Sequence, residues 1–141
     1  MRNIWLGLVF VAGLTSASAA QDLVNLKREI SGGDQGRKWT VKDVVVFKGA
    51  AGGCAAGDVY RFRPDNTLTH TWCENRRLRS VQQRWSIGTD TEGQSTIKID
   101  SLVYFVELRA GNISHLRLQY TPSDTKTAII TEIRMTAPAR R

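Results

Sequence analysis

The chain has 141 residues, of which 41% are hydrophobic and 23% charged, and its formal net charge is +7. This length fits one domain. The composition excludes disordered and collagen-like chains, which are more polar, more charged or richer in glycine and proline. Four Trp, four Phe and three Tyr residues supply large side chains for a core. We therefore expect a single folded, basic domain.

The first 20 residues have the pattern of a secretory signal peptide. Arg2 gives a basic start, residues 4–14 form an apolar run, and Ala17-Ser18-Ala19 matches a small-x-small cleavage site. The apolar run is about half of the ~20 residues that a membrane-spanning helix needs. No cysteine lies at the cleavage site to carry a lipid. We expect a periplasmic or secreted protein without a membrane span, beginning near Ala20 or Gln21; the alternative is an uncleaved N-terminal anchor.

After residue 20, a short helix or turn is predicted to precede β-structure. Leu23, Leu26 and Ile30 have helical spacing, and Gly32-Gly33-Asp34 ends this segment. Eight runs rich in Val, Ile, Thr and aromatic residues follow, with turn residues between them. These predicted strands are 38–47, 58–63, 67–73, 80–88, 95–100, 102–109, 113–120 and 127–136.

Alternating side chains in several runs indicate strands with one buried and one exposed face. Tyr60 and Phe62 alternate with polar residues, and so do Leu116 and Leu118. Short, evenly spaced strands without a crossover helix favour a sandwich or an up-and-down barrel. Eight strands favour closure, because a closed barrel has no exposed edge. We predict an all-β fold, an eight-stranded antiparallel up-and-down barrel with a short N-terminal helix or turn, and we expect a monomer.

Cys54 and Cys73 are the two cysteines of the chain. In an oxidising compartment they are expected to pair, and such a disulfide contributes about 3 kcal/mol in the chain-entropy model. A catalytic thiol or a metal ligand is the alternative. However, there is no CxxC motif, and the two histidines, His70 and His115, are distant in the sequence. We therefore predict a Cys54–Cys73 disulfide and no metal site.

Several residues together resemble a known family over about residues 36–135. They are Lys38-Trp39-Thr40-Val41, Cys54, Gly57-Asp58-Val59-Tyr60-Arg61-Phe62, Asp65-Asn66-Thr67-Leu68, Cys73, Trp85 with Ile87, and the stretch 104–118. The pattern resembles the small bacterial secreted lipocalin-like domains, although Asn66 replaces the usual hairpin glycine. The resemblance implies an eight-stranded barrel over residues 36–137, with Trp39 closing one end and a cavity for a small apolar molecule. Residues 21–35 are then an N-terminal segment and residues 138–141 a basic tail.

No catalytic constellation is recognisable in the sequence. The carboxylates are isolated, there is no Gly-x-Ser-x-Gly motif, and Ser114 and His115 point to opposite faces of one strand. The glycine-rich segment 49–57 lacks a following helix and is predicted to be a loop. We therefore expect no enzyme and no cofactor. Scattered arginines are typical of a solvated face, and export argues against nucleic acid; polyanion binding by Arg76-Arg77-Leu78-Arg79 is the alternative.

The expected function is the binding of a small hydrophobic or amphipathic ligand inside the barrel. One alternating face supplies the cavity wall, and the hydroxyl of Tyr60 or Tyr104 would orient a head group. The predicted ligand-binding residues are Trp39, Val41, Tyr60, Phe62, Trp85, Ile87, Tyr104, Val106, Leu116 and Leu118. One alternative is a barrel packed with these side chains. Another is a protein–protein module that resembles small periplasmic protease-inhibitor barrels and acts through residues 21–35.

Overall fold

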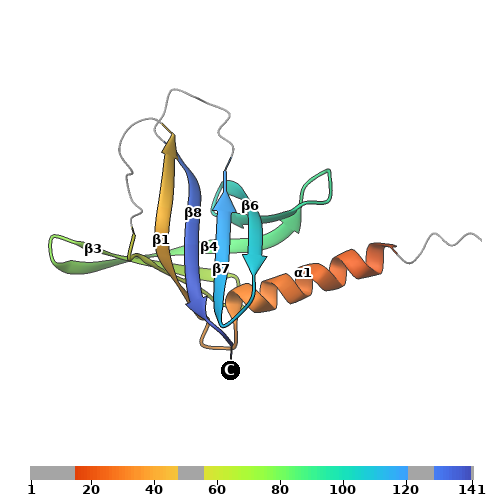
Figure 1. The fold of residues 1–141 in the computed structure, drawn as a ribbon, viewed down its shortest axis with the longest axis horizontal. Helices are drawn as coiled ribbons and strands as arrows, with labels where there is room; N and C mark the ends of the chain where they lie inside the picture. Colours follow the sequence, from red (N-terminus) through yellow and green to blue (C-terminus); the bar gives the residue numbers. More distant parts are fainter. Residues whose placement is uncertain (1–14, 48–55, 121–128, 141) are drawn as a thin grey trace, which may run out of the picture.

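The computed structural model describes residues 15–47, 56–120 and 129–140 (Figure 1). The elements are α1 (Thr15–Ser31), β1 (Arg37–Phe47), β2 (Val59–Phe62), β3 (Thr67–Glu74), β4 (Arg77–Thr89), β5 (Ser95–Ile99), β6 (Leu102–Arg109), β7 (Ile113–Gln119) and β8 (Ile129–Pro138). Most of the predicted signal peptide and most of the predicted loop 49–57, including Cys54, lie outside the described residues.

The eight strands form a closed antiparallel barrel in sequence order, as predicted. Closure is made by β1 and β8, which pair from Thr40 opposite Thr136 to Phe47 opposite Ile129 (Figure 1). Seven of the predicted strands overlap the observed ones to within about two residues at each end.

The prediction is less accurate at β4, which begins at Arg77 rather than at residue 80. Glu74 pairs with Arg77, so Asn75 and Arg76 form a two-residue turn. Their φ angles are 50° and 62°, as a type I′ hairpin turn requires. Turn residues were expected at Glu74-Asn75, but arginine rarely adopts a positive φ, and the strand was predicted to begin only at residue 80.

The inward-facing side chains of the strands form one apolar core. Its buried members are Ile30, Trp39, Val41, Tyr60, Phe62, Leu68, Trp85, Ile97, Ile99, Tyr104, Leu116, Leu118, Ile133, Met135 and Ala137. The predicted alternation is confirmed here, because Tyr60 and Phe62 lie inside while Arg61 between them is only partly buried.

One end of the barrel is closed by the last turns of α1, and the rest of the helix extends away from it (Figure 1). Ile30 is fully buried, and its carbonyl oxygen accepts a hydrogen bond of 2.9 Å from Nε1 of Trp39. Gly32, with φ of 67°, ends the helix and donates its N–H to the Arg28 oxygen. Trp39 therefore closes this end, as expected, together with a helix that begins before the predicted cleavage site.

Within the described residues, no helix combines the length and the apolar character needed to cross a membrane.

The hairpin of β3 and β4 extends beyond the barrel and forms what we call the arm, residues 72–83 (Figure 1). Pairing of β3 with β2 ends at Thr71, and pairing of β4 with β5 begins only at Trp85. Between these positions the two strands pair with each other. Leu78 near the tip is 79% exposed.

Candidate functional site

The ten predicted ligand-binding residues all lie in or against the apolar core of the barrel. Eight of them are buried, while Ile87 and Val106 are partly buried and pack against the others. The structure therefore brings the predicted set together on the inner face of the barrel. Their role in ligand binding stays a prediction.

The deepest members of this set pack tightly. Trp39, Phe62 and Leu118 have no exposed surface, and Leu116 has 1%. A side chain bordering a space wide enough for water would expose some surface to it. The interior around these residues is therefore filled by protein, at the density usual for a core.

A buried polar pair lies on the inner face, where sequence reasoning had found only isolated residues. Nε2 of His70 lies 2.9 Å from Oδ2 of Asp58, and both side chains are at most 8% exposed. The imidazole stacks on the ring of Tyr60 at a centroid distance of 4.4 Å. Ionisable groups are rarely buried in an apolar interior without a partner. Asp58 supplies that partner, and it fixes the orientation of the imidazole.

His115 lies on the outer face of β7, so the two histidines do not meet. No group of three His, Cys, Asp or Glu side chains suited to a metal occurs in the described ranges.

The inner face of β3 continues from the core onto the arm. Leu68 and His70 are buried, and Trp72, two residues further, is partly exposed with its ring 5.1 Å from that of His70. Across the hairpin, Val81 pairs with His70 and Arg79 with Trp72. We call His70, Trp72, Arg79 and Val81 the mouth face. The alternation of Leu68, His70 and Trp72 within the predicted strand 67–73 was the signal that could have identified it.

A second feature lies on the outer face of β1, β8, β7 and β6, where a hollow of about 620 Å³ opens. Its lining residues are Lys42, Asp43, Glu107, Arg109, His115, Leu116, Arg117, Arg134, Met135 and Thr136. Among the predicted ligand-binding residues only Leu116 contributes to it. No local pattern in the sequence predicts this hollow, because its lining residues come from four strands.

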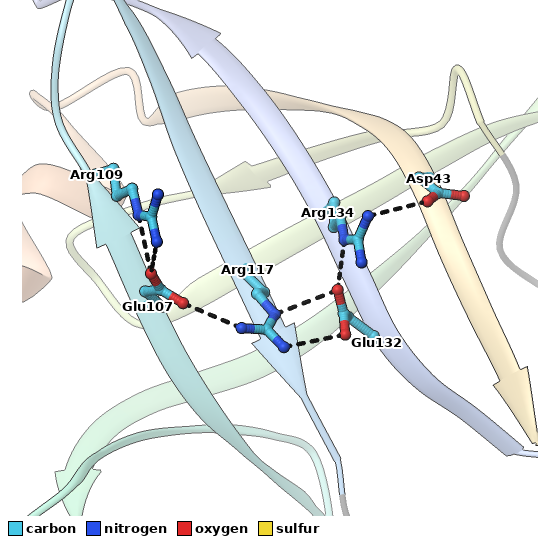
Figure 2. Close-up of polar contacts among 6 residues, drawn as sticks. All are labelled: Asp43, Glu107, Arg109, Arg117, Glu132 and Arg134. Carbon is cyan, nitrogen blue, oxygen red and sulfur yellow. Dashed lines mark hydrogen bonds and ion pairs between the residues drawn. The ribbon is translucent and has the colours of Figure 1, made fainter.

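Six charged side chains form a ladder across this hollow (Figure 2). In order they are Arg109, Glu107, Arg117, Glu132, Arg134 and Asp43. The distances include 2.7 Å from Arg109 Nη2 to Glu107 Oε1 and 3.4 Å from Arg134 Nη1 to Asp43 Oδ2.

Hydrogen bonds within the ladder favour the charged forms of Glu107, Glu132 and Arg117. The bond from Arg109, followed by that from Arg117, lowers the pKa of Glu107. The bond from Arg134 likewise lowers the pKa of Glu132, and the bond to Glu132 raises the pKa of Arg117. The three carboxylates and three arginines therefore neutralise one another.

Cys73 is exposed on the arm, opposite Leu78. In the described part of the chain it forms no disulfide, but its predicted partner Cys54 lies outside that part. The Cys54–Cys73 pairing stays a prediction.

No family model, curated protein or solved structure matches this chain. A closed, eight-stranded antiparallel barrel is consistent with a lipocalin-like domain.

Proposed function

We propose that this chain is an exported lipocalin-like protein that binds a small amphipathic ligand on the mouth face. One observation supports this best. Along β3 the inner face changes from buried side chains, with 0% exposure at Leu68 and 6% at His70, to a partly exposed one at Trp72, and Val81, which pairs with His70 on β4, is 42% exposed. An apolar surface that continues outward from a core in this way is typical of a ligand site at the open end of a small barrel.

The position of the mouth face follows from strand register. Leu68 pairs with Phe62, and Phe62 pairs with Arg37 at the start of β1, close to α1. Going along β3 from Leu68 to Trp72 therefore leads away from the end that α1 closes. A ligand on Trp72 and Val81 would approach from the other end of the barrel.

The chemistry of the mouth face indicates the class of ligand. Trp72 and Val81 offer apolar contact, which contributes about 25 cal/mol for each Å² buried. Arg79 lies opposite Trp72 and is paired with Glu74 at 3.4 Å, with both side chains 55% exposed. Such an exposed pair is weak, so an anionic head group can compete with Glu74 for the guanidinium. The proposed ligand has an apolar body and an anionic head group.

A dye titration tests the proposal, with 8-anilinonaphthalene-1-sulfonate as the probe and the full chain as the protein. Val81→Asp places a charge on the mouth face, and Val103→Asp is the matched control, because Val103 is 49% exposed on β6. We expect saturable binding that Val81→Asp weakens about tenfold, as for burial of an unpaired charge, and that Val103→Asp leaves unchanged. Circular dichroism verifies the fold of both variants. Equal effects, or no saturable binding, would refute the proposal.

Competition identifies the head group. Decanoate is expected to displace the dye, whereas dodecyltrimethylammonium is not, because Arg79 is cationic. If only the cationic competitor displaces the dye, the assignment of the head group to Arg79 is wrong.

The alternative of a protein-binding module acting through residues 21–35 is less well supported. Ile30 and Ser31 are at most 1% exposed, and Leu26 packs against the core. Part of the segment is therefore used to close the barrel. Native mass spectrometry separates the two functions: the ligand-binding proposal predicts a retained small mass, and an inhibitor predicts a co-purifying protease.

A further inference from the structure

Four members of the ladder in Figure 2 lie along one row of the sheet. Asp43 pairs with Arg134, Arg134 with Arg117, and Arg117 with Glu107 across four adjacent strands. Two arginines are thus directly opposite each other, an arrangement that is unfavourable by itself. Glu132 compensates for this, because its carboxylate contacts both guanidinium groups. The ladder is neutral, and Glu132, whose side chain is 11% exposed, positions both Arg117 and Arg134.

A β-bulge adds one further cation to the hollow. The register of β1 with β8 goes from Val41 opposite Met135 directly to Asp43 opposite Arg134, so Lys42 is the extra residue. Lys42 and Asp43 are both exposed, although neighbours in a regular strand point to opposite faces. Bulges often redirect a side chain beside a functional site. Lys42 lines the hollow and forms no ion pair with any described residue.

Further hydrogen-bond donors surround Lys42. His115 lines the hollow next to Arg109 and Thr136, its cross-strand neighbours. Within the part of the chain that the structure describes, Nη1 of Arg109 and Nη2 of Arg134 have no hydrogen-bond acceptor (Figure 2). The hollow therefore combines the uncompensated positive charge of Lys42 with unused guanidinium donors of Arg109 and Arg134.

We propose that this hollow binds a phosphate-type oxyanion carried by a small organic molecule. Guanidinium and ammonium groups are the usual ligands of phosphate oxygens. Because the nearly buried Glu132 already positions the Arg134 guanidinium, less side-chain entropy is lost there on binding. The volume of about 620 Å³ exceeds that of the anion alone, so the site has room for the remainder of a phosphate ester. This site is on the opposite face of the sheet from the mouth face and is independent of the function proposed above.

Phenyl phosphate and inorganic phosphate, titrated by calorimetry at constant ionic strength, test the site. Lys42→Met removes the uncompensated charge. Lys98→Met is the matched control, because Lys98 is an exposed lysine on β5 that is absent from the hollow. We expect saturable binding of phenyl phosphate that Lys42→Met weakens about tenfold, as for loss of a charge-assisted hydrogen bond, with no change in Lys98→Met.

The other outcomes are equally informative. Tighter binding of phenyl phosphate than of inorganic phosphate supports an ester as the ligand, and equal binding limits the site to the oxyanion itself. A further variant, His115→Gln, is expected to weaken binding while leaving the melting temperature unchanged. If Lys42→Met and Lys98→Met weaken the binding of phenyl phosphate equally, the effect comes from the overall charge of the protein, and the proposal is overturned. The absence of saturable binding would also overturn it.

Discussion

Replacing Arg37 by methionine is expected to loosen α1 from the barrel. The Arg37 guanidinium donates three hydrogen bonds: to the backbone carbonyl oxygen of Glu29 at 2.7 Å, to Ser114 Oγ at 3.0 Å and to the backbone carbonyl oxygen of Pro138 at 2.7 Å. It also lies over the ring of Trp39 at 4.5 Å. One buried side chain thus joins α1 to β7 and β8.

The magnitude follows from these contacts. A hydrogen bond to a charged group contributes about 1.5–3 kcal/mol, and Arg37→Met removes all three and leaves two backbone oxygens without this donor. Part of this loss is offset, because burial of the guanidinium is unfavourable and lowers the pKa of Arg37. Methionine also retains apolar contact with Trp39. We expect a net loss of about 3 kcal/mol in the free energy of unfolding.

Urea unfolding followed by tryptophan fluorescence measures this loss, and Arg140→Met is the control. Arg140 also contacts Glu29, at 2.8 Å, but the two side chains are 38% and 36% exposed. Removing such an exposed pair is expected to reduce stability by less than about 1 kcal/mol. Trypsin cleavage within α1 is expected to accelerate only in Arg37→Met. Similar losses in both variants would show that the Glu29 charge, rather than the buried hydrogen bonds, holds the helix.

Three further predictions concern the ladder, a turn and the cysteines. Glu132→Gln is expected to reduce the free energy of unfolding by about 1–2 kcal/mol at pH 7. Because the folded-state pKa of Glu132 is lowered, the difference between wild type and variant should shrink when urea unfolding is repeated from pH 7 down to pH 2. A difference that stays constant over this range would contradict the prediction. Gly36→Ala, which places a Cβ 2.7 Å from a backbone oxygen at φ of 75°, is expected to lower the melting temperature, whereas Gly33→Ala, with nothing within 4 Å, is not. Titration of the unfolded, unreduced protein is expected to find no free thiol if Cys54 and Cys73 are paired; two thiols would exclude the disulfide.

The architecture was predictable because it is encoded in local patterns. Leu116 and Leu118 alternate with polar residues, and this period identifies a strand without knowledge of its partners. Turn residues such as Asn66, which has φ of 67°, marked where strands end. Eight strands with short connections then favour closure. The buried set was predictable for the same reason, since the inward face of each strand can be read from its own sequence.

The cross-strand contacts of the two candidate sites were not predictable in this way, because they depend on register and closure. Asp58 and His70 meet only because Tyr60 is aligned with His70 across β2 and β3. Asp43 and Arg134 come from opposite ends of the barrel sequence, and the bulge at Lys42 has no local signal. An isolated carboxylate in the sequence therefore does not indicate an isolated carboxylate in the fold.

The pairing of β1 with β8 also has a kinetic consequence. Hairpins of neighbouring strands such as β3 and β4 form within microseconds in general, but joining the first and last strands requires ordering the whole intervening chain. Arg37 in β1 can reach the Pro138 oxygen only after that joining. Docking of α1 onto the barrel therefore follows the pairing of β1 with β8, which is the slowest step. Although α1 is synthesised before the strands, it is expected to be the last of these elements to dock.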